Sequence, residues 1–127
     1  MSLPVFAPNA PRSRMSGRSA KYQVLIAEGA EQDLDAIHDY LSDFDCVANA
    51  NHVLDALMEV VESLSRFTER GSYPKELVGL GIKEFRQTSF KPYRVIYRVT
   101  GSQVIIYLVA DGQRDMQSVL ARRLLGA

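Results

Sequence analysis

Tyr93–Thr100 (YRVIYRVT) and Gln103–Ala110 (QVIIYLVA) are the two stretches that decide the fold of this chain. Both are rich in β-branched and aromatic residues, which favour extended strands. The Thr100-Gly101-Ser102 turn between them predicts an antiparallel hairpin. The second stretch is apolar almost throughout, so we expect a central strand that is buried on both faces.

The first of these strands alternates apolar and basic side chains. Residues on one face of a strand recur at every second position. One face therefore carries Val95, Tyr97 and Val99, and the other carries Arg94, Ile96 and Arg98. We expect the apolar face to pack against helices, and the arginines to point away from the core into an open face of the sheet.

Two amphipathic helices are predicted upstream of these strands. Apolar residues recur in both at spacings of three and four, as expected for a helix with one buried face. The pattern breaks near Asp45–Val47, which indicates an αα-hairpin with both apolar stripes turned toward one core. The stripes consist of Leu34, Ile37, Leu41 and Phe44 in the first helix, and of Val47, Ala50, Leu54, Leu57, Val61 and Leu64 in the second.

Three further elements complete the order. Lys21–Ala27 and Ile82–Ser89 are predicted as strands, and roughly Asp115–Leu125 is predicted as a last helix. Glycine, proline and serine predict turns between residues 68 and 81. The order β-α-α-β-β-β-α predicts an α+β fold in which the helical hairpin packs on a small antiparallel sheet. The predicted core includes Leu34, Ile37, Leu57, Val61, Val95 and Ile105.

Size and composition are those of a single domain. The chain has 127 residues, of which 46% are hydrophobic and 24% are charged, as in ordinary globular proteins. Residues 1–20 hold three prolines, four serines and three arginines but no acid, which predicts a flexible N-terminal arm. The domain is therefore expected to span residues 21–127.

Several kinds of site are poorly supplied by this composition. One cysteine, Cys46, cannot build a disulfide framework or a cysteine-cluster zinc site, and two histidines, His38 and His52, supply few ligands for a histidine-based metal site. No apolar run approaches the roughly 20 residues that cross a bilayer, and no phosphate loop, dinucleotide fingerprint or HExxH motif is present. We expect a cytoplasmic protein with no membrane association and no cofactor, whose histidines and cysteine have structural positions.

The net charge of zero conceals a strong segregation of charge. Residues 1–27 carry four basic groups and no acid, residues 28–62 carry ten acids and no Lys or Arg, and the remainder carries eleven basic groups and five acids. One part of the fold must therefore be acidic and another basic. Two interpretations remain open: solvated faces that partly neutralise each other, or a basic surface kept for an anionic partner.

Basic residues interleaved with tyrosines are the most distinctive chemical feature of the predicted sheet. Arginine holds phosphates in a bidentate fork and aromatic rings stack on bases, so nucleic acid is one hypothesis for the partner. The alternative is an ordinary polar face, or a face that pairs with the acidic helices. The basic residues are Lys83, Arg86, Lys91, Arg94, Arg98 and Arg114, and the tyrosines are Tyr93, Tyr97 and Tyr107.

Five segments, in this order, resemble the RelE/ParE toxin superfamily. AEQDLDAIHDYL, at residues 30–41, is similar to the family's first-helix pattern A-x-x-D-L-x-x-I-x-x-Y. Gly81–Arg86 (GIKEFR) resembles the strand that precedes the family's YR-x-x-Y segment, which Lys91–Thr100 resembles in turn. Val104–Asp115 and Leu120–Leu124 resemble the remaining C-terminal part.

The resemblance implies a RelE/ParE-like domain that is the toxin of a plasmid-stabilisation or chromosomal type II toxin–antitoxin pair. Its partner would be a cognate antitoxin that wraps the toxin and blocks it. RelE-type members cut mRNA in the ribosomal A site, whereas ParE-type members inhibit DNA gyrase without known hydrolytic chemistry.

Individual residues bear on the choice between these branches. By the resemblance, Arg94 matches the arginine of the YR motif, Arg114 matches the arginine after the last strand, and Lys83 and Arg86 lie in the strand that carries the RelE lysines. In a ribonuclease these four would hold the scissile phosphate. RNA cleavage also needs groups that remove and donate protons. The predicted last helix has no tyrosine and the second half of the chain has no histidine, which favours ParE-like action.

Three hypotheses follow: a ParE-like inhibitor of a protein such as DNA gyrase, a RelE-like ribosome-dependent endoribonuclease, and a non-toxic co-repressor. We expect Arg86, Arg94 and Arg114 to converge on one exposed patch, which would bind the target or the antitoxin together with Arg98. The basic patch predicts an antitoxin with an acidic C-terminal region that lies across the sheet and the helical hairpin and covers Arg86 and Arg94. Self-association into a homodimer is left open.

Overall fold

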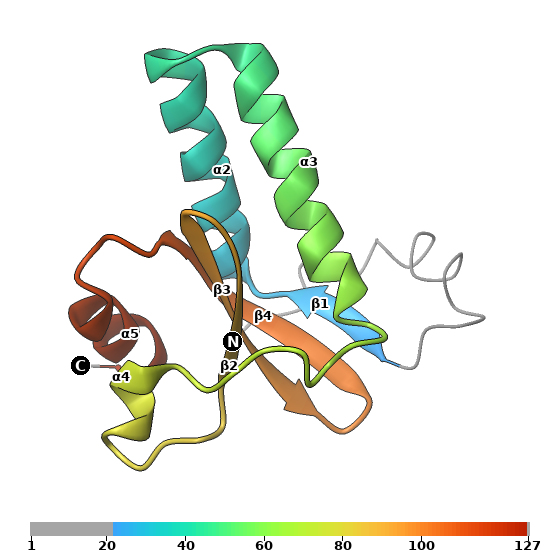
Figure 1. Ribbon diagram of the computed structural model, residues 1–127, viewed down its shortest axis with the longest axis vertical. Coiled ribbons are helices and arrows are strands. Elements are labelled where there is room, and N and C mark those ends of the chain that lie inside the picture. Colours follow the sequence, from blue (N-terminus) through green and yellow to red (C-terminus); the bar gives the residue numbers. More distant parts are fainter. Residues whose placement is uncertain (1–21, 127) are drawn as a thin grey trace.

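The computed structural model describes residues 22–126, which form a four-stranded sheet with helices on both faces (Figure 1). The strands follow the order β1-β4-β3-β2 across the sheet. The elements are β1 (Gln23–Ile26), α2 (Glu28–Phe44), α3 (Val47–Ser63), α4 (Lys75–Val78), β2 (Arg86–Phe90), β3 (Tyr93–Thr100), β4 (Gln103–Asp111) and α5 (Met116–Leu124).

The predicted α+β fold is confirmed, and the sheet is mixed. β2, β3 and β4 are antiparallel neighbours, whereas β1 pairs with β4 in parallel, from Gln23 opposite Gln103 to Ile26 opposite Ile106. The expectation of a purely antiparallel sheet is therefore wrong at β1. Parallel neighbours need a long crossover connection, and the rest of the domain supplies it between β1 and β4.

The helical hairpin α2–α3 covers one face of the sheet and forms the main core with it. Leu57, Val61 and Leu64 from the α3 side pack in one cluster with Val95 and Tyr97 of β3. All five are at most 1% exposed. The predicted apolar face of β3 is confirmed. Of the predicted core residues, Leu34, Leu57, Val61, Val95 and Ile105 are buried and Ile37 is half-buried.

The apolar stripes of the hairpin do not stay buried to its far end. Phe44, at the end of α2, is 74% exposed, and Val47, at the start of α3, is 57% exposed. Their predicted place in the core is wrong because the two helices extend past the sheet, as Figure 1 shows. The helical spacing predicted the correct face of each helix but not how far the sheet reaches along it.

The opposite face of the sheet is covered as well. Leu77 of α4 and Met116, Val119 and Leu120 of α5 bury Ile96 completely in a second cluster. The expectation of an open sheet face around Ile96 is therefore wrong. The short helix α4 lies within the segment predicted as turns, and four residues are too few to show helical periodicity.

A register shift between β3 and β4 adds Tyr107 to the side chains that pack against this second cluster. Ile96 is paired with Leu108 and Tyr97 with Ile106, so Tyr107 is an extra residue in β4. Such a bulge changes the side to which the following side chains point. Tyr107 packs against the second cluster, where its ring meets Phe85 edge-on at a centroid distance of 5.7 Å.

An ion pair links the helices on the two faces of the sheet where β1 has ended. Asp33 of α2 accepts two hydrogen bonds of 3.0 Å from the guanidinium of Arg123 in α5. The same carboxylate accepts the N–H of Val109 at 3.0 Å, and Arg123 donates to the carbonyl of Tyr107 at 3.2 Å. A Cβ on Gly29 would lie 2.7 Å from this guanidinium, so the glycine makes room for it.

Two further expectations concern the limits of the chain. The predicted arm at residues 1–20 lies outside the described residues. Within residues 22–126, no helix is long and apolar enough to cross a lipid bilayer.

We predict that Asp33→Ala lowers the free energy of unfolding by about 1–3 kcal/mol, because it removes the carboxylate that accepts hydrogen bonds from the Val109 N–H and from the Arg123 guanidinium. Urea denaturation followed by circular dichroism measures the change. Asp35→Ala is the matched control, since Asp35 is exposed on the same helix and should change stability by less than about 0.5 kcal/mol. Equal effects of the two substitutions would contradict a special role for Asp33.

Candidate functional site

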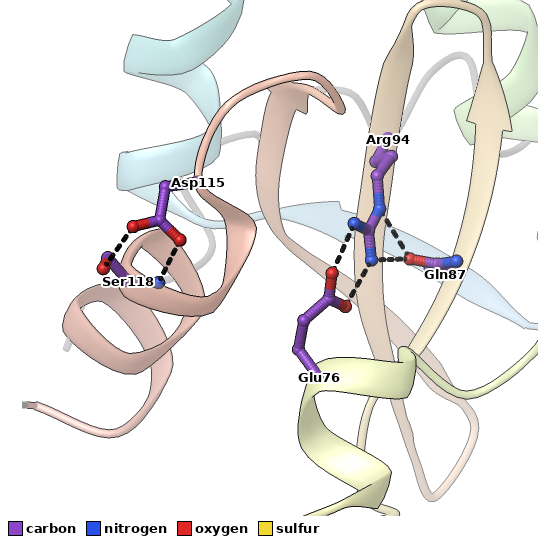
Figure 2. A network of polar contacts seen from close by, with 5 residues as sticks. All are labelled: Glu76, Gln87, Arg94, Asp115 and Ser118. Carbon is purple, nitrogen blue, oxygen red and sulfur yellow. Dashed lines mark hydrogen bonds and ion pairs between the residues drawn. The ribbon is translucent and has the colours of Figure 1, made fainter.

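Arg94 lies at the centre of a polar network between the sheet and α4 (Figure 2). Its two terminal nitrogens donate to the two carboxylate oxygens of Glu76 at 2.9 and 3.0 Å. Its Nε donates to the side-chain oxygen of Gln87 at 2.8 Å, and one terminal nitrogen also contacts that oxygen. The side chains of Arg94 and Glu76 are only 15% and 12% exposed. The guanidinium is thus fully engaged inside the protein.

Local structure brings these three residues together. Arg94 is paired with Ser89 across β2 and β3, and Gln87 lies two residues from Ser89 on the same face of β2. Glu76 is in the first turn of α4, which begins after Pro74. The chain passes close over Arg94 at Gly112, where a Cβ would lie 2.9 Å from the Arg94 Cδ.

The electrostatics of the pair follow from this geometry. The hydrogen bonds from Arg94 lower the pKa of Glu76 below its ordinary value, against a smaller opposing effect of burial. Glu76 is therefore an anion at neutral pH, and its two oxygens neutralise the arginine in a bidentate contact. A phosphate would need the same donors.

Arg86 lies in a different environment from Arg94. It is paired with Tyr97 at the start of β2, on the face covered by the helical hairpin. Its guanidinium donates to the carbonyl of Gly71 at 2.9 Å and to the hydroxyl of Tyr73 at 3.2 Å. It also lies over the Tyr73 ring, 4.6 Å from the centroid. Arg86 therefore holds the 71–73 segment against the sheet edge.

Tyr97 supports the same segment from within the core. Its hydroxyl donates to the carbonyl of Thr68 at 2.8 Å and accepts the N–H of Gly71 at 3.1 Å. Burial of this fully enclosed side chain raises its pKa. A Cβ on Gly71 would clash with the Tyr97 hydroxyl and the Gln87 carbonyl, so this close approach requires glycine.

The predicted convergence of the arginines on one patch is wrong. Arg86 and Arg94 lie on opposite faces because their paired positions in β2 are three residues apart and faces alternate along a strand. Arg98 is half-buried on β3, and Arg114 and Lys83 are exposed on connecting segments. The separation was not visible in the sequence, since it depends on the register between β2 and β3.

A groove runs along the edge strand β2 beside Arg94. It has a volume of about 730 Å³, and Ser89 and Tyr93 form part of its wall. Lys75 and Lys91, both exposed, also line it. Lys75 was missed in the sequence because it lies in the segment predicted as turns. Arg94 lines the groove as well, but Glu76 and Gln87 engage its guanidinium, so the exposed cations of the groove are the two lysine ammonium groups.

Asp115 has a structural role at the end of the resembling segment. It caps α5, where its carboxylate accepts the N–H of Ser118 at 3.3 Å and its hydroxyl at 2.8 Å, as Figure 2 shows. These hydrogen bonds lower the pKa of Asp115. The aspartate that follows Arg114 therefore starts the last helix.

Both histidines lie at the surface or boundary of the hairpin helices, as predicted, and Cys46 lies at the break between these helices. The ring of His38, which is half-buried on α2, lies 2.7 Å from the Asn51 oxygen on α3, and His52 is exposed. The Cys46 sulfur accepts the N–H of Asn49 at 3.4 Å and caps α3. Throughout residues 22–126, no cluster of three or more His, Cys, Asp or Glu residues could hold a metal ion.

Comparisons with known proteins place the fold. The family model of the ParE toxin of the type II toxin–antitoxin system, parDE, matches residues 24–116, from within β1 to the first residue of α5. A chain of the chromosomal ParDE system from P. aeruginosa has a similar structure, with a TM-score of 0.62, 21% identity, and coverage of 72% of this chain and 96% of that chain.

A second solved structure is similar to a lesser degree. A chain of the toxin–antitoxin complex RelBE2 from Mycobacterium tuberculosis has a TM-score of 0.54 and 21% identity, with coverage of 72% of this chain and 98% of that chain. No curated protein sequence matches. At 21% identity these two structures show a shared fold alone.

We predict that Glu76→Gln reduces stability by about 1–2 kcal/mol at neutral pH and removes part of its acid dependence. The folded-state pKa of Glu76 is lowered, so the carboxylate stabilises the fold above its ordinary value of 4.5, and this stabilisation is lost as pH falls through the folded-state value. Urea denaturation between pH 3 and pH 7 checks it. Glu84→Gln, at an exposed position, is the control; identical pH profiles for both variants would refute the prediction.

Proposed function

The chain belongs to the ParE toxin family of type II toxin–antitoxin systems, and from this premise we propose that it inhibits a protein target, DNA gyrase, without hydrolysing a substrate. The proposal concerns the target and the mode of action. It is supported by the state of the cationic side chains that a ribonuclease of the same superfamily would need.

The position of Arg94 and Arg86 carries this proposal. A scissile phosphate needs several free cationic donors that meet at one point. Arg94 is closed off by Glu76 and Gln87, and Arg86 lies on the other face of the sheet with its own internal acceptors. These two arginines cannot clamp the same phosphate in this fold, so the geometry favours binding over RNA cleavage.

Side chains suited to proton transfer are scarce around the sheet as well. A ribonuclease must deprotonate the attacking 2′-hydroxyl and protonate the leaving oxygen. Burial raises the pKa of Tyr93 and of Tyr97, so neither phenol is suited to accept a proton at neutral pH, and the Tyr97 hydroxyl is enclosed in the core, where Thr68 and Gly71 engage it. Both histidines lie on the helical hairpin and not on the sheet.

Induction of the chain alone in bacteria separates the three hypotheses. We predict filamentous growth arrest with DNA-damage signalling, and inhibition of supercoiling when the purified chain is added to purified gyrase. Primer extension on RNA from the arrested cells should show no new codon-positioned cuts. Rapid translation arrest with such cuts would instead identify a ribosome-dependent endoribonuclease, and normal growth would indicate a non-toxic co-repressor.

We also propose that a cognate antitoxin neutralises the chain in the cytoplasm, where gyrase and the ribosome are found. The antitoxin is expected to place an acidic C-terminal segment along the β2 edge. The groove there presents Lys75 and Lys91 as exposed cations, and within residues 22–126 the outer backbone of β2 pairs with Ser72 alone. An extended segment can add to a strand edge while charge steers its approach. The antitoxin segment would then cover Arg86 and Arg94 without forming ion pairs with them.

Charge reversal tests this antitoxin interface. We predict that Lys75→Glu with Lys91→Glu slows association with the antitoxin at least tenfold at low salt and flattens its salt dependence. Stopped-flow or surface-coupled binding at several salt concentrations measures both. Lys83→Glu is the matched control, because Lys83 is exposed but does not line the groove. Equal association rates for all variants would exclude the groove from recognition.

A further inference from the structure

The outer end of the helical hairpin carries large apolar side chains in contact with solvent. Tyr40 and Phe44 of α2 are 60% and 74% exposed, and Val47 of α3 is 57% exposed. The two aromatic rings lie against each other with centroids 4.7 Å apart. We name this surface the hairpin tip; it consists of Tyr40, Phe44 and Val47 with the neighbouring acids Asp39, Asp43 and Asp45.

The hairpin tip is not needed to complete a core. Its three apolar residues belong to none of the buried clusters described for residues 22–126. The turn between the two helices lies at the end farthest from the sheet (Figure 1). Contiguous exposed aromatic groups on a folded domain mark interaction surfaces, and aromatic residues supply much of the binding energy at such surfaces.

Local contacts hold the hairpin tip in a defined shape. The Cys46 sulfur caps α3, and the Asp45 carboxylate accepts the Asn49 side-chain N–H at 2.7 Å. Farther along, the His38 ring and the Asn51 oxygen join the two helices at 2.7 Å. A surface that is ordered before binding loses less conformational entropy when it binds.

The charge around these apolar groups specifies the partner. Asp39, Asp43 and Asp45 are all exposed, and residues 28–62 contain no Lys or Arg. A complementary surface must therefore offer an apolar pocket with a basic rim. A second copy of the hairpin tip is unsuitable, because two sets of three carboxylates would face each other.

We propose that the hairpin tip is the surface with which this toxin binds its protein target, at an apolar pocket rimmed by Lys and Arg. This inference rests on the proposed function as a target-binding inhibitor. It assigns the target to one end of the molecule and leaves the β2 groove to the antitoxin.

The test uses the full chain with Tyr40→Ser and Phe44→Ser combined, and purified gyrase as the probe. The double variant should bind gyrase at least tenfold more weakly and lose growth arrest, while its thermal melt and its neutralisation by the antitoxin stay as in the wild type. Leu80→Ser is the matched control, since Leu80 is 56% exposed on the C-terminal side of α4 and should leave target binding unchanged.

Charge reversal at the hairpin tip provides a second, independent test of this proposal. Asp39→Lys with Asp43→Lys should weaken gyrase binding and reduce its salt dependence without lowering stability. The proposal for the hairpin tip would be overturned by double variants that arrest growth as strongly as the wild type. It would also be overturned by variants that lose only antitoxin binding. A wild type that arrests growth without binding gyrase would refute the proposed target, while the growth comparison would still decide on the surface.

Discussion

The fold depends on how the backbone N–H and C=O groups of β4 find hydrogen-bond partners beyond the end of β1. β4 has nine residues and β1 only four, so the later part of β4 lacks a neighbouring strand on that side. Asp33 supplies an acceptor for the Val109 N–H, and Arg123 supplies a donor for the Tyr107 carbonyl. Because buried backbone groups need partners, this pair replaces a missing strand and ties α2 to α5. The aspartate of the first-helix pattern thus has a structural reason.

Covering both faces of the sheet determines what its arginines can do. α4 exists as a single turn over Ile96, and that position brings the Glu76 carboxylate onto Arg94. The arginine of the YR motif is therefore neutralised by the same helix that completes the second core. The exposed cations that line the groove lie outside the two-residue YR sequence, at Lys75 on α4 and at Lys91 on the β2–β3 turn. Motif identity and chemical availability are separate properties in this chain.

The sequence predicted the fold better than the site, for a physical reason. Local periodicity identified α2, α3, β3 and β4, and β3 was predicted with its observed limits, Tyr93–Thr100. Periodicity cannot report which strands are neighbours, so the parallel pairing of β1 was missed. The prediction of the site was wrong for the same reason. Whether Arg86 and Arg94 meet depends on the register between β2 and β3. Glu76 reaches Arg94 only because of helix α4, which was not predicted.

The hairpin is longer than the sheet requires. Buried residues in α2 end at Leu34 although the helix continues to Phe44, so the last turns of α2 add little to the core, whereas Ala50 in the first turn of α3 is already buried. Helical turns without tertiary packing are marginal in water, and here caps and contacts between the helices maintain them. Exposed Phe44 would favour nonspecific association, yet the surrounding carboxylates oppose it by charge. The hairpin tip thus combines two properties. Its exposed apolar side chains can enter a pocket, and its carboxylates can pair with basic residues around that pocket.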